Sequence, residues 1–277
     1  MIEKEIQFRK KRELGNILSD SFEFLKQEYK PISKLILIYV LPFLILYGVV
    51  QVYVQMKLIG TFDLNDPETM MANIGPVYKN IFLFSLFGIF VQSLLIGTYY
   101  SYIEIYIKKG KGNFDLSEIK PQLFSNSLIA LGAGFVVFVI TMIGIVMCIV
   151  PGVYFANTFS IVVMIALFEK KGLNNAMSRS WNLVNSQWWN TLLINIVGIV
   201  IIWAVGFVLT LPAMLTGITT SIIGVQDTEV INYPDWYWVL IGVSTVISSL
   251  LWIIPATFIA MQYFNLDEHT KSDNPFQ

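Results

Sequence analysis

Long apolar blocks make up most of the chain, and they restrict its fold more than any other feature of the sequence. Several run for 18 residues or more without a charged side chain, which is the length at which a helix can cross a bilayer. A soluble domain carries about 25% charged residues. This chain carries 13% and is 55% hydrophobic, so a soluble fold would have to hide nearly all of its surface. The sequence therefore predicts an all-α, polytopic membrane protein.

We predict six transmembrane helices, at residues 34–56, 80–107, 127–150, 151–168, 188–215 and 237–263. The third and fourth adjoin without a polar loop. Joined as one helix they would have 42 residues and a length of about 63 Å, twice the bilayer core of about 30 Å. The chain should therefore reverse near Pro151-Gly152, because proline and glycine favour turns.

The segment before the first span is predicted to form an amphipathic helix over residues 14–29. Its apolar residues recur at the spacing of one helix face, so the helix either lies in the membrane interface or packs on a partner or on the protein itself. Acidic residues through the segment, and the lack of a short apolar core with a cleavage site, argue against a cleavable signal. We divide one membrane domain (1–277) into this segment (1–33), the six-span bundle (34–263) and a polar tail (264–277).

Basic residues lie almost entirely on one side of the predicted spans. Sixteen of the eighteen precede the first span, follow even-numbered spans or lie in the tail, which by the positive-inside rule places both termini in the cytoplasm. The opposite loops are acidic, with Asp63, Asp66, Glu68, Asp227, Glu229 and Asp235. Aromatic residues support the boundaries, because they favour membrane interfaces. Trp188 and Trp189 are expected at the inner interface, Trp236 and Trp238 at the outer, and Tyr99, Tyr100, Tyr102 and Tyr106 crowd the inner end of the second span.

An internal repeat relates residues 14–22 to residues 173–181. The matched pairs are Leu14 with Leu173, Asn16 with Asn175, Ser19 with Ser178, Ser21 with Ser180, and Phe22 with Trp181. Residues 114–126 occupy the same place in the topology with a weaker match. The pattern predicts three parallel units, each a surface helix followed by a helical hairpin. Chance similarity between amphipathic helices is the alternative.

The region 151–189 resembles a group of bacterial multi-pass proteins. These include the membrane domain found with some glycerophosphodiester phosphodiesterases and the UPF0259 (YciC-like) inner-membrane proteins. The resemblance rests on a Pro-Gly that opens a span, a Glu and a Gly at its end, and an Ala and a Ser ahead of Trp, here Pro151, Gly152, Glu169, Gly172, Ala176, Ser180 and Trp188 or Trp189. It implies an integral protein of the bacterial inner membrane and no reaction, since the phosphodiesterase chemistry of such proteins lies in a separate soluble domain.

Residues for common kinds of intramembrane catalysis are missing from the sequence. The only histidine, His269, lies in the polar tail. The only cysteine, Cys148, lies in an apolar run, where we expect it to be a packing residue. Paired-histidine sites and zinc-protease motifs are therefore excluded, and the sequence contains no nucleophile-elbow or phosphate-binding-loop motif. We predict no catalytic, metal or cofactor site. Nucleic acid is not expected as a partner, because the basic cluster at residues 9–12 adjoins a membrane helix and would meet anionic lipid.

Polar residues inside the spans are the remaining candidates for function, since polarity is costly in lipid. Glu104 lies one turn before Lys108, which favours an i,i+4 ion pair over a ligand contact. Glu169 could pair with Arg179 and dock the helix that carries Arg179, Ser180 and Trp181, or it could be a solvated helix end. Hydrogen bonds between helices are expected for Asn157, Asn195 and Gln92.

These observations favour a non-catalytic membrane protein that serves as an accessory or scaffold subunit, with membrane lipids and other membrane proteins as partners. The alternative is a transporter or lipid-handling protein whose hairpins enclose a cavity lined by Asn157, Asn195, Gln92 and Glu104. An intramembrane enzyme would need acids clustered at one depth, for which only Glu104 and Glu169 are candidates.

Overall fold

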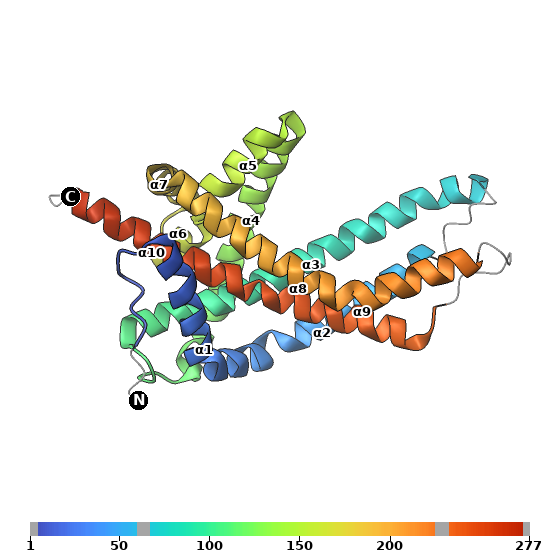
Figure 1. Ribbon diagram of the computed structural model, residues 1–277, viewed down its shortest axis with the longest axis horizontal. Coiled ribbons are helices and arrows are strands. Elements are labelled where there is room, and N and C mark those ends of the chain that lie inside the picture. Colours follow the sequence, from blue (N-terminus) through green and yellow to red (C-terminus); the bar gives the residue numbers. More distant parts are fainter. Residues whose placement is uncertain (1–4, 60–66, 225–232, 274–277) are drawn as a thin grey trace. The chain divides into compact units, whose positions relative to one another are not determined.

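The computed structural model describes residues 5–59, 67–224 and 233–273, and these fold entirely into helices and their connections (Figure 1). The elements are α1 (Leu14–Tyr39), α2 (Leu41–Ile59), α3 (Pro67–Lys109), the 3-10 turn η1 (Leu116–Glu118), α4 (Lys120–Met147), α5 (Ile149–Thr158), α6 (Val162–Phe168), α7 (Leu173–Ser186), α8 (Trp188–Gly224), α9 (Asp235–Leu251) and α10 (Ile253–Asp273). Five helical segments are long and apolar enough to span a membrane, and the bent pair α1–α2 adds a sixth. The predicted all-α polytopic fold is confirmed. The acidic loop residues Asp63, Asp66, Asp227 and Glu229 lie outside the described residues.

The first span differs from its predicted bounds. Residues 14–29 continue without a break into α1, which ends at Tyr39, and α2 leaves it at an angle of 62°. The bend precedes Pro42, and proline disfavours helical backbone in the residue before it. The amphipathic segment and the start of the predicted span are therefore one helix.

The turn between the third and fourth spans lies three residues earlier than predicted. Cys148 is extended, with φ −173° and ψ 151°, and α5 begins directly after it. Pro151 lies in the first turn of α5, where its missing N–H leaves no helical bond unmade. A Cβ on Gly152 would lie 2.8 Å from the backbone nitrogen of Ile145, so this glycine allows α5 to approach α4. Cys148 is exposed, which contradicts its predicted packing role.

The surface helix predicted from the repeat at residues 173–181 is present as α7, and Gln187 separates it from α8. The weak third copy at 114–126 forms no such helix, because the chain makes the short turn η1 and then enters α4. The stronger pair of repeats is supported by burial. Each of residues 14–22 has the same class of exposure as its counterpart in 173–181, with Ile17 and Ser21 as buried as Ala176 and Ser180.

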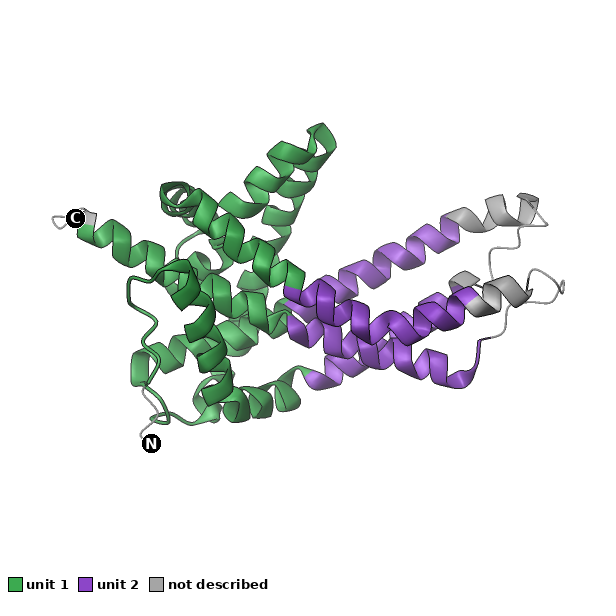
Figure 2. Ribbon diagram, viewed as in Figure 1, with its two compact units in different colours: residues 1–40, 93–200, 252–277 green, residues 41–92, 201–251 purple. Residues whose placement is uncertain are grey.

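Helix contacts divide the chain into two compact units (Figure 2). Unit 1 comprises residues 1–40, 93–200 and 252–277, and unit 2 comprises residues 41–92 and 201–251. Within unit 2, α2 packs against α9 so closely that a Cβ on Gly48 would lie 2.9 Å from the carbonyl oxygen of Gly242. Contacts of this kind allow helices to associate in lipid, where no hydrophobic effect drives them together.

The core of unit 1 is aromatic. Its largest fully buried side chains include Tyr99, Tyr102, Tyr106, Phe24, Phe258 and Phe264. The tyrosines of α3 therefore form the core of unit 1, although the sequence placed them in an interfacial belt. The predicted polar tail also begins inside this core, because α10 continues to Asp273 and buries Phe264 and Leu266.

Candidate functional site

The candidate site is a network of ionised side chains that holds α7 in unit 1. Helix α7 is amphipathic and buries Ala176, Ser180, Leu183 and Val184 along one face. Helix α6 ends at Phe168, and the four-residue connection Glu169 to Gly172 turns the chain into α7. Lys170 in this connection has a φ of 50°, a left-handed conformation that most residues avoid.

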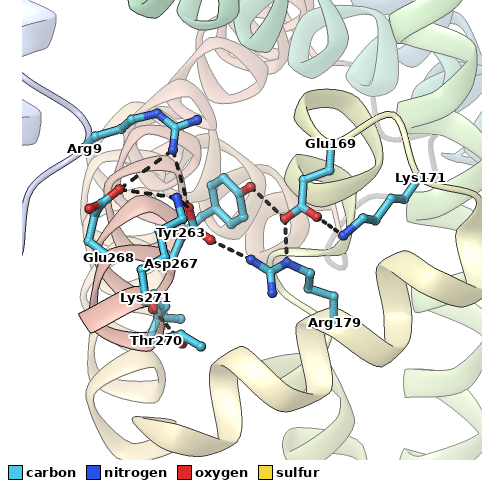
Figure 3. Close-up of polar contacts among 10 residues, drawn as sticks. Arg9, Glu169, Lys171, Arg179, Tyr263, Asp267, Glu268, Thr270 and Lys271 are labelled. Carbon is cyan, nitrogen blue, oxygen red and sulfur yellow. Dashed lines mark hydrogen bonds and ion pairs between the residues drawn. The ribbon is translucent and has the colours of Figure 1, made fainter. Parts of the chain in front are cut away.

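Glu169 binds three donors from three parts of the chain (Figure 3). Its Oε1 accepts hydrogen bonds from Arg179 Nε at 2.7 Å and from the Tyr263 hydroxyl at 3.0 Å. Its Oε2 lies 2.5 Å from Lys171 Nζ. The predicted pair between Glu169 and Arg179 is therefore present, and Tyr263 connects it to α10.

Asp267 on α10 is a second acidic centre, with a side chain only 5% exposed. Arg179 Nη2 donates to its Oδ1 at 2.6 Å, while Lys271 Nζ and Arg9 Nη1 lie 2.6 Å and 3.4 Å from its Oδ2. Arg179 thus bridges Glu169 and Asp267, as Figure 3 shows. Guanidinium suits this role because its planar fork can donate to two acceptors at once.

Sequence reasoning missed Asp267, Tyr263 and Arg9 as members of this network. Asp267 was assigned to the polar tail, whereas it is buried. The spacing of Tyr263, Asp267 and Lys271 offered a signal, because residues four apart share one face of a helix. No local pattern relates these residues to Arg9 or Arg179.

The charges in the network stabilise one another. Burial alone would raise the pKa of Glu169, but the hydrogen bonds from Lys171, Arg179 and Tyr263 outweigh it and hold that pKa below its usual value. Burial would likewise lower the pKa of Arg179, but Glu169 and Asp267 raise it above its usual value. Both groups are ionised at neutral pH, so Glu169 and Arg179 form a permanent ion pair.

A pH dependence follows from the depressed pKa of Glu169. A carboxylate whose pKa is lower in the folded state stabilises the fold above its unfolded pKa of about 4.5, and this stabilisation is lost as the pH falls through the folded pKa. We expect the melting temperature of the protein in detergent to fall as the pH drops below about 4.5. Glu169→Gln should show a smaller fall over that range, and an identical pH profile for the two proteins would contradict the assignment.

A second set of polar contacts joins α5, α7 and α8. Ser180 Oγ donates to the carbonyl of Thr158 at 2.7 Å, and Trp188 Nε1 donates to Thr158 Oγ1 at 3.2 Å. Asn157 Nδ2 donates to the carbonyl of Trp188 at 3.0 Å, and Asn195 Nδ2 donates to Asn157 Oδ1 at 2.9 Å. The predicted interhelical bonds of both asparagines are confirmed, and Ser180 contributes to docking as expected.

Trp181 contributes less to docking. Its ring meets Tyr154 and Phe159 at centroid distances of 5.6 and 6.0 Å, but the residue remains 39% exposed. Trp181 therefore contacts α5 with one edge and presents the remainder at the surface.

The other candidates do not join these sites. Glu104 forms the predicted i,i+4 ion pair with Lys108. Gln92, in unit 2, has a buried Nε2 without a hydrogen-bond partner among the described residues, so its predicted interhelical bond is not found there. The described residues include no group of three or more histidine, cysteine or acidic side chains placed to hold a metal ion.

The basic cluster at residues 9–12 is only partly available to lipid, contrary to expectation. The side chain of Arg12 is 1% exposed and donates to Asp20 Oδ2 at 2.7 Å and to the carbonyls of Gln7, Phe8 and Lys10. Its backbone nitrogen donates to Asn265 Oδ1 on α10 at 2.7 Å. Arg12 therefore holds the N-terminal segment against α10 within unit 1.

Comparison of the chain with protein-family models, with curated proteins and with solved structures found no match. The resemblance to UPF0259-like proteins therefore remains an expectation.

Proposed function

We propose that this protein is a non-catalytic subunit of a membrane assembly, with an accessory or scaffold role. We further propose that it resides in the bacterial inner membrane with both termini in the cytoplasm. The distribution of basic residues supports the orientation, and the resemblance of region 151–189 supports the location.

The observation that carries this proposal is the saturation of the two acidic centres. Glu169 and Asp267 each accept from three donors of the chain itself, and Arg179 is shared between them. General acid–base catalysis favours a carboxyl whose pKa lies near the working pH. The donors around Glu169 instead hold its pKa below the usual value, which suits a carboxylate that fixes a helix in place. The network therefore supports a structural role for α7.

A candidate partner surface lies on α1 and α7. Phe22 and Trp181, which occupy equivalent positions in the two repeats, are 45% and 39% exposed. Exposed aromatic residues on otherwise polar helix faces are typical of protein interfaces and of membrane interfaces. Two docked helices that present the same kind of residue would give a scaffold a repeated attachment surface.

The transporter alternative receives less support. Its proposed cavity lining included Asn157 and Asn195, whose amides bond each other, and Glu104, which pairs with Lys108. Within unit 1 these polar groups satisfy one another, which leaves them less free to bind a transported solute.

Isolation of the tagged protein from its native membranes in mild detergent, with mass spectrometry of co-purifying proteins, tests the proposal. We expect a partner at comparable abundance, reduced by Phe22→Ala combined with Trp181→Ala. Trp189→Ala, which removes an aromatic residue that is 73% exposed, is the matched control. Recovery of the chain without any stoichiometric protein would contradict a subunit role.

A further inference from the structure

A cavity of about 850 Å³ lies in unit 1 between the first half of α4, the end of α6 and the start of α7. Its lining includes Gln122, Asn126, Ile129, Val136, Lys170 and Lys171. A cavity of this size falls in the range of small-molecule sites. Gly132 also lines the cavity, and an added Cβ there would meet no atom within 4 Å.

The lining changes from polar to apolar along α4. Gln122, Ser125 and Asn126 lie toward the start of α4, and the lining from Ile129 to Val136 is apolar. Because α5 and α6 follow α4 and pack back along it, Lys170 after α6 lies toward the polar end. From Gln122 to Val136 the helix rises about 21 Å, compared with about 15 Å for half of a bilayer core. The cavity therefore has the length and polarity of one lipid leaflet together with its headgroup region.

The polar end of the cavity is cationic. Lys170 is exposed and has no ion pair within the described part of the chain. Lys171 also lines the cavity. It forms an ion pair with Glu169, which is not among the lining residues. The left-handed backbone of Lys170 would suit glycine better. A lysine at this position places a positive charge in the cavity lining despite the cost in backbone strain.

We propose that this cavity binds one phospholipid of net negative charge. The headgroup phosphate would lie at Lys170 and Lys171, and an acyl chain would lie along α4 from Ile129 to Val136. The proposal is independent of the scaffold role, since a bound lipid can be structural in any membrane protein.

Native mass spectrometry of the purified full-length protein, supplied with dioleoyl phosphatidylglycerol or dioleoyl phosphatidylcholine, tests this site. We expect one molecule of phosphatidylglycerol to be retained in preference to phosphatidylcholine. Lys170→Gly should weaken the retention of phosphatidylglycerol about fivefold, the effect of one basic residue beside an anionic lipid. The same variant should melt at or above the temperature of the parent protein, because glycine relieves the left-handed backbone. Loss of lipid without loss of stability would show that Lys170 binds the lipid and does not stabilise the fold.

Two matched controls complete the test. Gly132→Leu fills the cavity and should abolish the preference for phosphatidylglycerol, whereas Gly134→Leu, on the same helix and equally free of neighbours within 4 Å, should not. Lys26→Gln removes an equal charge from an exposed position of α1 outside the cavity and should leave retention unchanged. Equal retention of the two lipids by the parent protein, or equal effects of the two glycine variants, would overturn the proposal.

Discussion

Replacement of Arg179 by alanine is expected to increase the fraction of molecules in which α7 is undocked from the remainder of unit 1. The variant removes the cation shared by Glu169 and Asp267, and Asp267 is almost fully buried. Removal of one partner from a buried ion pair costs about 3–5 kcal/mol. Arg179 is partly exposed and both carboxylates keep another cation, so we expect a cost of about 2 kcal/mol. That corresponds to an increase of about 30-fold in the population of the undocked helix.

Trypsin reports this opening directly, because Lys170 and Lys171 lie in the connection between α6 and α7. When opening is fast relative to cleavage, the rate of cleavage follows the population of the open state. Arg179→Ala should therefore be cut at this connection about 30 times faster than the parent protein. Arg9→Ala is the control, since Arg9 is 53% exposed and 3.4 Å from Asp267, and its rate should change no more than about threefold. Unchanged cleavage of Arg179→Ala would show that the network does not hold α7.

The membrane spans could be predicted from the sequence because lipid imposes a simple requirement. A spanning helix needs about 20 apolar residues, and that requirement appears in any window of the sequence. The separate helix α7 was predictable for a similar reason, since its apolar residues recur on one face. Both features depend on residues close together in the chain.

Helix ends were less predictable because proline and glycine have more than one use. The sequence predicts a turn at Pro151 and Gly152, but proline is tolerated in the first turn of a helix and glycine permits close packing. The structure uses both residues in these other ways, inside α5. The bend actually occurs at Cys148, whose residue type carries no turn signal.

The ion-pair network was only half predictable. Glu169 and Arg179 are ten residues apart, near enough for a local argument, and their pair was anticipated. Asp267 lies 88 residues from Arg179 and 258 residues from Arg9, and its role depends on how α10 packs. Without the tertiary contacts, an acidic residue in a polar segment such as Asp267 is predicted to be exposed to solvent.

The second large effect is expected where α3 approaches α4 in unit 1. A Cβ on Gly97 would lie 2.6 Å from Cα and 2.7 Å from the backbone nitrogen of Ser127. No rotamer change relieves a clash with backbone, so Gly97→Ala should force the helices apart. Overpacking of this kind costs roughly 1–3 kcal/mol. The displacement would also strain the hydrogen bond from Asn126 Nδ2 to Ser101 Oγ, which is 2.8 Å long.

Gly134→Ala on α4 is the matched control, because a Cβ there meets no atom within 4 Å. Alanine favours helix over glycine by about 0.5–1 kcal/mol, so this variant should be neutral or more stable than the parent protein. Thermal unfolding in detergent should therefore separate the two variants by about 1–4 kcal/mol, and only Gly97→Ala should be less stable than the parent. Asn126 also lines the cavity proposed for phospholipid, so Gly97→Ala should weaken lipid retention, whereas Gly134→Ala should not. Equal stability of the two variants would mean that α3 and α4 do not approach each other at Gly97.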